Sequence, residues 1–258
     1  MKLRLALLAG ALISVLALAP SALAVPTGGC TPTDLVRDGH PLTAANIALP
    51  AEVITGPQNA HGCDIGVYVN VSDVQIQSAD VNTARYFGVA VNGSSGSAII
   101  DTSDVHHIGD VVDAPNVFGG SQHGIAVAFL NGATGTIRDA NIHDYQKGGV
   151  VANGTGTRLD TLSSTVRGLG PVPYIAQNGV QYSDHATGLV RDNLITDHQY
   201  TGCSKQQSRT GSCVYYESIG LLLLNVEPKD IKRSLNLYRD NDKNEFVWPS
   251  SSYANAFQ

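Results

Sequence analysis

One short phrase recurs six times along the chain and limits what it can fold into: a glycine, then small or β-branched apolar residues, often ending in asparagine. A period of 22 to 25 residues with two or three short strands is typical of a β-solenoid, whose coils stack at about 4.8 Å. The longer spacings predict inserted loops, which commonly build the binding surfaces of solenoids. The copies begin at Gly66, Gly88, Gly124, Gly149, Gly179 and Gly220, spaced 22, 36, 25, 30 and 41 residues apart.

A second phrase of alternating apolar residues precedes most copies and predicts strands with one buried face. Within it we expect one inward-facing ladder made of Val105, Ile142, Val166 and Ile195. A β-sandwich also has alternating strands, but it does not need a glycine at the same point of every unit. A leucine-rich repeat would need leucine at a fixed spacing, which is missing here. The repeat therefore favours an all-β solenoid.

The repeat resembles that of a known family. Asn141–Ile142 followed by Gly149–Val150, and Asp192–Ile195 followed by Gly220–Leu221, resemble the parallel β-helix repeat of pectate-lyase-like proteins. The likeness covers about residues 50 to 247 and implies a single-domain right-handed parallel β-helix of about seven coils. The superfamily includes lyases, hydrolases, epimerases, adhesins and non-catalytic members, so it implies a fold more than a reaction. Exported bacterial right-handed β-helix proteins carry phrases like Tyr145–Gly149 and Ile175–Gly179.

Both ends of the chain differ from the repeat. Lys2 and Arg4, an apolar run over Leu5–Ala19 and the small residues of Ala22–Ala24 fit a secretory signal peptide. We therefore expect a secreted, monomeric protein with no membrane span. The predicted parts are a signal peptide at 1–24, an N-terminal cap at 25–52, the parallel β-helix at 53–249 and a C-terminal tail at 250–258.

The chain has four cysteines, which allow three pairings in an exported protein. Cys30 and Cys63 lie before the first regular repeat, whereas Cys203 and Cys213 bracket a polar loop. We predict two disulfides, Cys30–Cys63 and Cys203–Cys213, because disulfides persist in oxidising compartments.

Charge and motifs narrow the classes of partner. The net charge is −6 and the pI about 5.7, which argues against nucleic acid, whose phosphates require a basic surface. Asp240-x-Asp242-x-Asn244 begins like a calcium loop but lacks its glycine and closing glutamate, so we predict no metal ligands. No cofactor is evident from the sequence, although the resemblance leaves calcium open.

Stacking the copies gathers polar residues at one corner of the middle coils. His and Lys side chains can take a proton, Asp can orient a His, and Gln and Asn can hydrogen-bond sugar hydroxyls. Tyr86, Tyr145 and Tyr174 are candidates for stacking on sugar rings. The candidate catalytic residues are His123, His143, Lys147 and Asp144. The candidate substrate-binding residues are His106, His107, Gln122, Gln146, Arg167, Gln177, Asn178 and Gln181.

These residues and the fold predict a polysaccharide-active protein, with a lyase or C5-epimerase of acidic polysaccharide as the first hypothesis. Lys147 or Arg167 would neutralise a uronate carboxylate while a His or Lys removes the C5 proton. A hydrolase ranks lower because the sequence has no adjacent pair of aspartates. The alternative is a non-catalytic solenoid that binds cell-wall glycan or is purely structural. Each Asn, Gln or His also has a structural interpretation, because such residues often satisfy backbone groups at solenoid corners.

Overall fold

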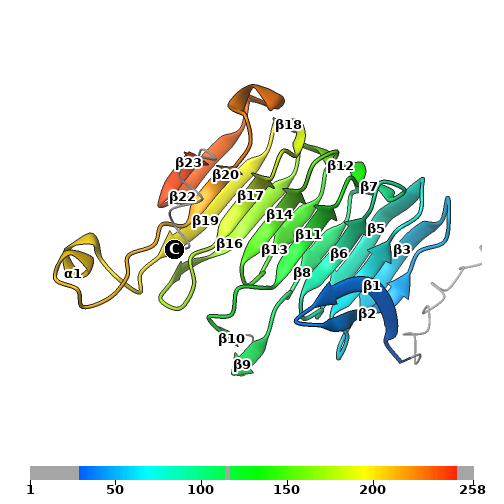
Figure 1. Ribbon diagram of the computed structural model, residues 1–258, viewed down its shortest axis with the longest axis horizontal. Helices are drawn as coiled ribbons and strands as arrows, with labels where there is room; N and C mark the ends of the chain where they lie inside the picture. The colour runs from blue at the N-terminus through cyan, green and yellow to red at the C-terminus, as the bar shows by residue number, and fades with distance from the viewer. Residues whose placement is uncertain (1–28, 114–116, 249–258) are drawn as a thin grey trace, which may run out of the picture.

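The computed structural model describes residues 29–113 and 117–248, which wind into a parallel β-helix (Figure 1). The predicted signal peptide at 1–24, the tail at 250–258 and Pro249 lie outside the described residues. Neither of the two short helices that the described residues contain is long or apolar enough to cross a membrane. These helices are α1 (Lys205–Arg209) and the 3-10 helix η1 (Pro228–Asp230).

One side of the solenoid is a nine-stranded sheet, called the first sheet below. Its strands are parallel except for β1, which pairs antiparallel with β2. In spatial order the strands are β1 (Thr31–Arg37), β2 (His40–Ile47), β4 (Ile65–Val69), β6 (Phe87–Asn92), β11 (Ile125–Leu130), β14 (Gly148–Asn153), β17 (Asn178–Ser183), β20 (Ile219–Leu224) and β23 (Lys243–Trp248).

The other side is a twelve-stranded sheet, the second sheet, which contains two parallel ladders joined at β5 (Val74–Asn82). One ladder continues through β3 (Val53–Asn59), β7 (Ser97–Asp101), β12 (Thr134–Arg138), β15 (Arg158–Leu162), β18 (Thr187–Arg191) and β21 (Ile231–Ser234). The other continues through β8 (Asp104–His106), β13 (Asn141–His143), β16 (Thr165–Val172), β19 (Leu194–Tyr200) and β22 (Leu237–Asn241). A small hairpin of β9 (Val111–Asp113) and β10 (Val117–Phe118) lies outside both sheets.

The predicted inward ladder is confirmed. Val105 pairs with Ile142, Ile142 with Val166, and Val166 with Ile195, and all four side chains are fully buried. Facing them across the interior are apolar residues of the first sheet, such as Val150. Apolar side chains at equivalent positions of successive coils therefore stack on one another along the axis. This stacking explains how a chain with few charged residues forms a continuous core.

The corner between the two ladders of the second sheet is sharp and repeats. Thr102, Asp139, Ser163 and Asp192 occupy it in successive coils, with φ angles between 47° and 58°. Asp is among the residues that best tolerate this left-handed conformation. The next residue turns inward and is small or hydrogen-bonded, as where the backbone N–H of Ser164 donates to Asn193 Oδ1 at 2.9 Å. Short polar residues therefore set the bend of each coil.

The glycine phrase is confirmed in five copies and wrong in one. A Cβ on Gly88 would lie 2.6 Å from the carbonyl oxygen of Ala126, so successive coils approach closely there. Because Val89 pairs with Val127, the residue equivalent to Gly88 is Ala126 and not Gly124. Gly124 lies just before β11 with a φ of 83°, where it lets the inserted loop turn back into the sheet.

The N-terminal end is closed by the hairpin of β1 and β2. The Cys30–Cys63 disulfide joins this hairpin to the first coils, as predicted. Leu42 and Tyr68 belong to a buried cluster beneath the hairpin, on the outer face of the first sheet. Because β2 already pairs with β4, parallel stacking begins inside the segment that the sequence assigns to the cap.

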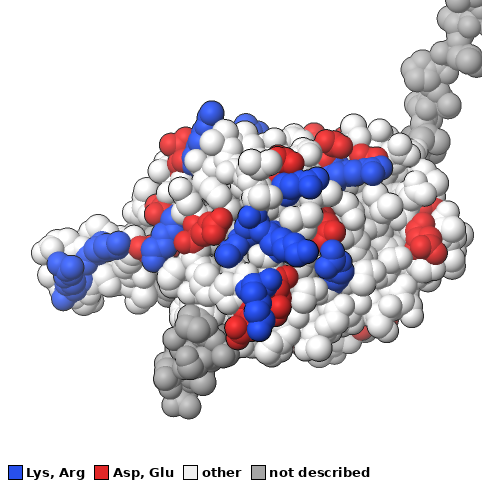
Figure 2. All heavy atoms as spheres, turned by 90° about the horizontal axis from the view of Figure 1, so that it is seen from above, with Lys and Arg blue, Asp and Glu red and all other residues white. Residues whose placement is uncertain are grey.

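A projecting loop carries the second predicted disulfide, Cys203–Cys213, which is also confirmed. The loop holds helix α1, which begins with a capping box between Ser204 and Gln207 and extends from one end of the solenoid in Figure 1. Figure 2 shows that basic side chains occupy this projection, while basic and acidic side chains lie next to each other on the body of the same face. Ion pairs such as Arg138–Asp101 at 2.7 Å are typical of that mixture.

Candidate functional site

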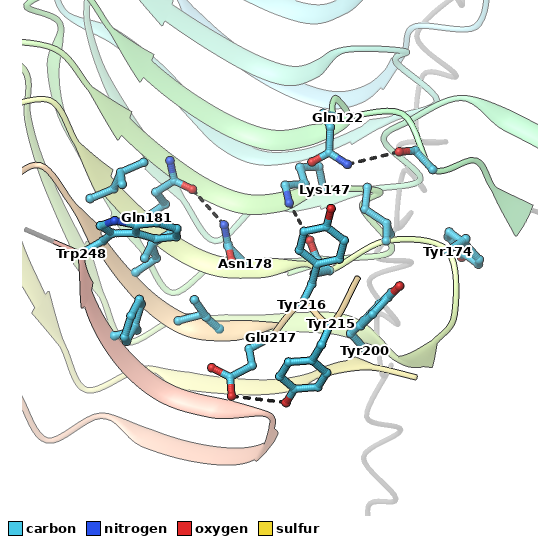
Figure 3. Close-up of a pocket in the computed structure, with 17 residues that line it drawn as sticks. Gln122, Lys147, Tyr174, Asn178, Gln181, Tyr200, Tyr215, Tyr216, Glu217 and Trp248 are labelled. Carbon is cyan, nitrogen blue, oxygen red and sulfur yellow. Dashed lines mark hydrogen bonds between the residues drawn. The ribbon is translucent and has the colours of Figure 1, made fainter. Parts of the chain in front are cut away.

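A groove of about 1170 Å³ lies over the outer face of the first sheet, towards its C-terminal half (Figure 3). Its floor is formed by outward-facing residues of neighbouring strands, because Gln181 pairs with Leu222 and Leu222 with Phe246. Its wall comes from segments that lead into the first sheet, including both inserted loops. The lining residues are Gly120, Gln122, Lys147, Tyr174, Ile175, Ala176, Asn178, Gln181, Tyr200, Tyr215, Tyr216, Glu217, Ile219, Leu222, Leu224, Phe246 and Trp248.

Among the described residues, Lys147 is one of two charged residues that line the groove, and it is half-buried. Its Nζ donates a hydrogen bond of 2.7 Å to the carbonyl oxygen of Ala176. No carboxylate among the described residues forms an ion pair with it. Burial lowers the pKa of Lys147 to about 8, because removal from water disfavours the charged ammonium. The residue is therefore a partly desolvated cation whose charge is not balanced locally.

Glu217 is the other charged residue of the lining, and its charge is balanced. Its carboxylate forms an ion pair with Lys205 at 3.1 Å and another with Lys243, and it accepts a hydrogen bond of 3.3 Å from the Tyr215 hydroxyl. Burial raises the pKa of Glu217, but the hydrogen bonds from Lys243 and Lys205 outweigh it and hold the pKa below its usual value. Glu217 is therefore a fixed carboxylate that orders the wall, and it is a poor proton donor.

Four of the predicted catalytic and substrate-binding residues come together in this groove: Gln122, Lys147, Asn178 and Gln181. Asn178 Nδ2 donates to Gln181 Oε1 at 3.0 Å, so the two amides are held side by side on β17. Gln122 lies on the exposed inserted loop, where its Nε2 donates to the carbonyl of Gly120 at 3.2 Å. Of these amides, that of Gln122 is exposed, that of Gln181 is half-buried and that of Asn178 is buried.

Gln146 and Gln177 do not reach the groove, although both were predicted to bind substrate. Both side chains are fully buried. Gln146 Nε2 donates to the carbonyl of Gly119 at 2.7 Å, and Gln177 Nε2 donates to that of Tyr145 at 2.6 Å. They satisfy backbone groups of the loops, which is the structural role that such residues often have at solenoid corners.

His123 was predicted to be catalytic, but only 6% of its surface is exposed. Its Nε2 lies 2.5 Å from Asp110 Oδ2, and its ring lies against Tyr86 with 4.4 Å between centroids. Asp110 also accepts from Arg85 at 2.6 Å. This network ties the inserted loop to the body of the solenoid, so His123 is placed as a structural residue behind the groove wall.

The other predicted residues gather on a different face. His106, His143 and Arg167 form an outward ladder on the second sheet, flanked by His107 and Asp144, and none of the five lines the groove. The His106 and His143 rings stack with 5.1 Å between centroids. The prediction that these five residues lie close together is confirmed. The prediction that they lie beside Lys147 is wrong, because the coil corner between the two sheets separates them from it.

Carboxylates hold this second face in place. His106 Nε2 lies 2.9 Å from Asp80 Oδ1, and His143 bonds to Asp104 and Asp144 at 3.0 Å each. The hydrogen bond that His143 donates to the Asp144 carboxylate raises the pKa of His143, and burial lowers the pKa of His107. In the part of the chain that the structure describes, no group of three or more His, Cys, Asp or Glu side chains is arranged to hold a metal ion.

Most of the aromatic residues that line the groove were not predicted from the sequence. Of the predicted stacking residues, Tyr174 lines the groove, whereas Tyr145 is buried in the core and Tyr86 packs against His123. Tyr215 and Tyr216 directly follow the Cys203–Cys213 loop and precede a glycine phrase, at the same corner as Lys147. This shared position before a glycine phrase is the sequence feature from which the two tyrosines could have been predicted as groove residues. The aromatic residues found only in the structure are Tyr200, Tyr215, Tyr216, Phe246 and Trp248.

The fold and the groove define a parallel β-helix protein with an open, aromatic-lined groove on one sheet. Residues 57–217 match the family described as right handed beta helix region, which is more than half of the chain, and the protein belongs to that family. No curated protein and no solved structure matches the chain.

Proposed function

We propose that the groove binds an acidic polysaccharide, and the observation that carries this proposal is Lys147, an unbalanced cation among aromatic and amide side chains. Aromatic rings present flat apolar faces to sugar rings, and amides pair with hydroxyls. Asn178 and Gln181 supply the amides, while Tyr215 and Tyr216 supply faces on the wall. A uronate carboxylate would balance the charge of Lys147.

The chemistry that this site supports best is removal of the C5 proton of a uronate, as in a lyase or a C5-epimerase. The pKa of about 8 leaves a fraction of Lys147 as the free amine at neutral pH, and that amine can act as a general base. In β-elimination the amine takes the C5 proton, the electron pair of the C5–H bond forms the C4–C5 double bond, and the C4–O bond breaks with its electron pair on the leaving oxygen, which takes a proton from water. In epimerisation a proton returns to C5 from the opposite face. His143 and Asp144 have no place in this proposal, because they lie on the second sheet.

A non-catalytic glycan-binding function is the second candidate, and the state of Glu217 favours it. Its low pKa makes it a poor acid, so Lys147 is the one free ionisable base of the described lining apart from the tyrosines. A groove that only binds would still need the cation, the amides and the aromatic faces. The two candidate functions have the same ligand, and they differ only in whether the bound polysaccharide is chemically changed.

The binding test is calorimetric titration of the protein with polygalacturonate and with alginate, each compared with the same polymer after carboxyl reduction. We expect binding of an intact polymer and at least tenfold weaker binding of its reduced form. Lys147→Gln should lose most of the affinity, while Lys229→Gln, a change at an exposed lysine of η1 outside the groove, should not. Equal affinity for intact and reduced polymers would reject the proposal.

The activity test follows the ultraviolet absorbance of unsaturated ends and the exchange of the C5 proton in deuterated water, over the same polymers. Appearance of either signal, and its loss in Lys147→Gln, would support the lyase or epimerase. Tight binding with neither signal would leave the protein as a glycan-binding solenoid.

A further inference from the structure

The two ends of the groove differ in polarity. On β17 the outward residues Asn178, Gln181 and Ser183 are all polar, and the first two line the groove, whereas Ser183 is buried. One coil further, their pairing partners on β20 are all apolar: Ile219, Leu222 and Leu224. On β23 the equivalent positions are Lys243, Phe246 and Trp248. Lys243 pairs with Glu217 and its Nζ lies 4.2 Å from the centroid of the Phe246 ring, so the apolar surface on this strand is formed by the two aromatic side chains.

This change occurs on the outer face of a sheet, where side chains are not needed for the core. The inner face of the same strands already carries the core residues Val180, Leu221 and Leu223. Phe246 and Trp248 remain partly exposed and meet edge to face, with 6.1 Å between centroids. An apolar area that lines a groove and continues its polar part is expected to bind apolar ligand atoms.

The position of Lys147 in the sheet gives the distance between its charge and the apolar end of the groove. It directly precedes β14, and β17 and then β20 follow along the sheet. With strands about 4.8 Å apart, Leu222 lies two strands, or about 10 Å, beyond the strand that Lys147 begins. A polymer lying across the strands would therefore present a carboxylate at one point and an apolar group one or two sugar units away.

We propose that the ligand is an acidic polysaccharide carrying short O-acyl groups, such as acetyl esters, and that the apolar end formed by Leu222, Leu224, Phe246 and Trp248 binds the acyl group. An acetyl ester on a hydroxyl adds a methyl group and leaves the uronate charge free for Lys147. A methyl ester of the carboxylate would add a methyl group but remove that charge. The proposal rests on the proposed function, because it places the acyl group on the same bound polymer.

The chain provides its own probe, because Trp248 is its only tryptophan and lines the apolar end. Emission of Trp248 is followed during titration with O-acetylated polygalacturonate, with the same batch after mild saponification, and with a methyl-esterified batch. We expect the acetylated polymer to bind at least about threefold more tightly than the saponified one and to shift the emission, as burial of one methyl group implies. The methyl-esterified polymer should bind more weakly than both.

Variants separate the apolar end from general effects on stability. Phe246→Ala should remove the preference for the acetylated polymer, so that the acetylated and saponified polymers bind with equal affinity. Leu235→Ala, at a side chain that is 79% exposed and outside the groove, is the matched control and should keep the preference. Thermal unfolding confirms that both variants fold, and if Phe246→Ala does not, Phe246→Ser or Leu224→Ser takes its place.

Each remaining outcome has one meaning. Equal affinity for acetylated and saponified polymers, or calorimetric binding without any change in Trp248 emission, would overturn the acyl inference while leaving the proposed function intact. Failure of both polymers to bind would instead reject the proposed function. A preference that survives Phe246→Ala would place the acyl group elsewhere and also overturn the inference.

Discussion

His198 provides the sharpest test of how this solenoid is held together, because it is a fully buried titratable group inside the core region. Its Nδ1 lies 2.7 Å from Asn241 Oδ1, and an amide oxygen can only accept, so Nδ1 carries the hydrogen. Its Nε2 then accepts from the hydroxyl of Tyr145, which is also fully buried. Both ring nitrogens are satisfied only when the imidazole is neutral.

Burial lowers the pKa of His198 to about 4, while the hydrogen bond to Asn241 partly opposes it. In the unfolded chain the pKa returns to about 6.5. A histidine with a lowered folded pKa stabilises the fold above pH 6.5, and this contribution is lost as the pH falls towards 4. One pKa unit corresponds to about 1.4 kcal/mol, so the full loss is about 3.5 kcal/mol, and the loss between pH 7.5 and pH 5 is about 2 kcal/mol.

The assay is urea unfolding of the protein and of His198→Gln at pH 7.5 and pH 5. The free energy of unfolding of His198→Gln should fall by about 2 kcal/mol less than that of the parent over this interval. Other titrating groups cancel in the comparison, and His185→Gln, at an exposed position, should behave like the parent. Parallel pH dependence of the parent and His198→Gln, or a ring titration near pH 6.5 by NMR, would refute the assignment of a buried neutral imidazole.

Three further predictions test the architecture. Gly179→Ala should lower the free energy of unfolding by more than about 2 kcal/mol in denaturant titration, because its Cβ would meet the Gly220 carbonyl oxygen at 2.6 Å. Gly29→Ala, which meets nothing within 4 Å, is the control. Asn193→Ala should cost about 1 to 3 kcal/mol in the same titration, because the buried N–H of Ser164 loses its acceptor. Cys203→Ser with Cys213→Ser should speed amide hydrogen exchange over residues 201–218 and leave the middle coils unchanged, whereas slow exchange throughout would contradict a disulfide-held loop.

The coil pattern could be predicted from the sequence because it depends on local rules. Val105 and Ile142 occupy the same point of consecutive units, and a period-two pattern fixes which face each side chain takes. The two disulfides followed from their position around a cap and a loop. The exception was Gly124, where an inserted loop of variable length hid the true register and a glycine two residues away took the place of Ala126.

The groove could be predicted only in part, because it depends on how inserted loops fold over the sheet. Lys147 and Asn178 were found because they lie next to glycine phrases. Gln146 has the same residue type and position as a binding residue, yet it points inward, since the loop backbone around Gly119 needs a donor. Trp248 belongs to a strand that carries no glycine phrase, so nothing in the repeat aligned it with the groove.

The two roles proposed for Lys147, binding a carboxylate and removing a proton, should depend on pH in opposite directions. Measuring both against pH therefore distinguishes the two roles in a single protein. Carboxylate binding needs the ammonium, which prevails below the pKa of about 8, so affinity should fall as pH rises from 7 to 9. Proton removal needs the free amine, so turnover of bound polymer should rise over the same interval. Lys147→Arg keeps its charge throughout, so it should retain binding at pH 9 and show no turnover at any pH. Calorimetry and initial rates between pH 6.5 and 9 measure both, and affinity of the parent protein that does not change over this range would show that Lys147 does not pair with the ligand carboxylate.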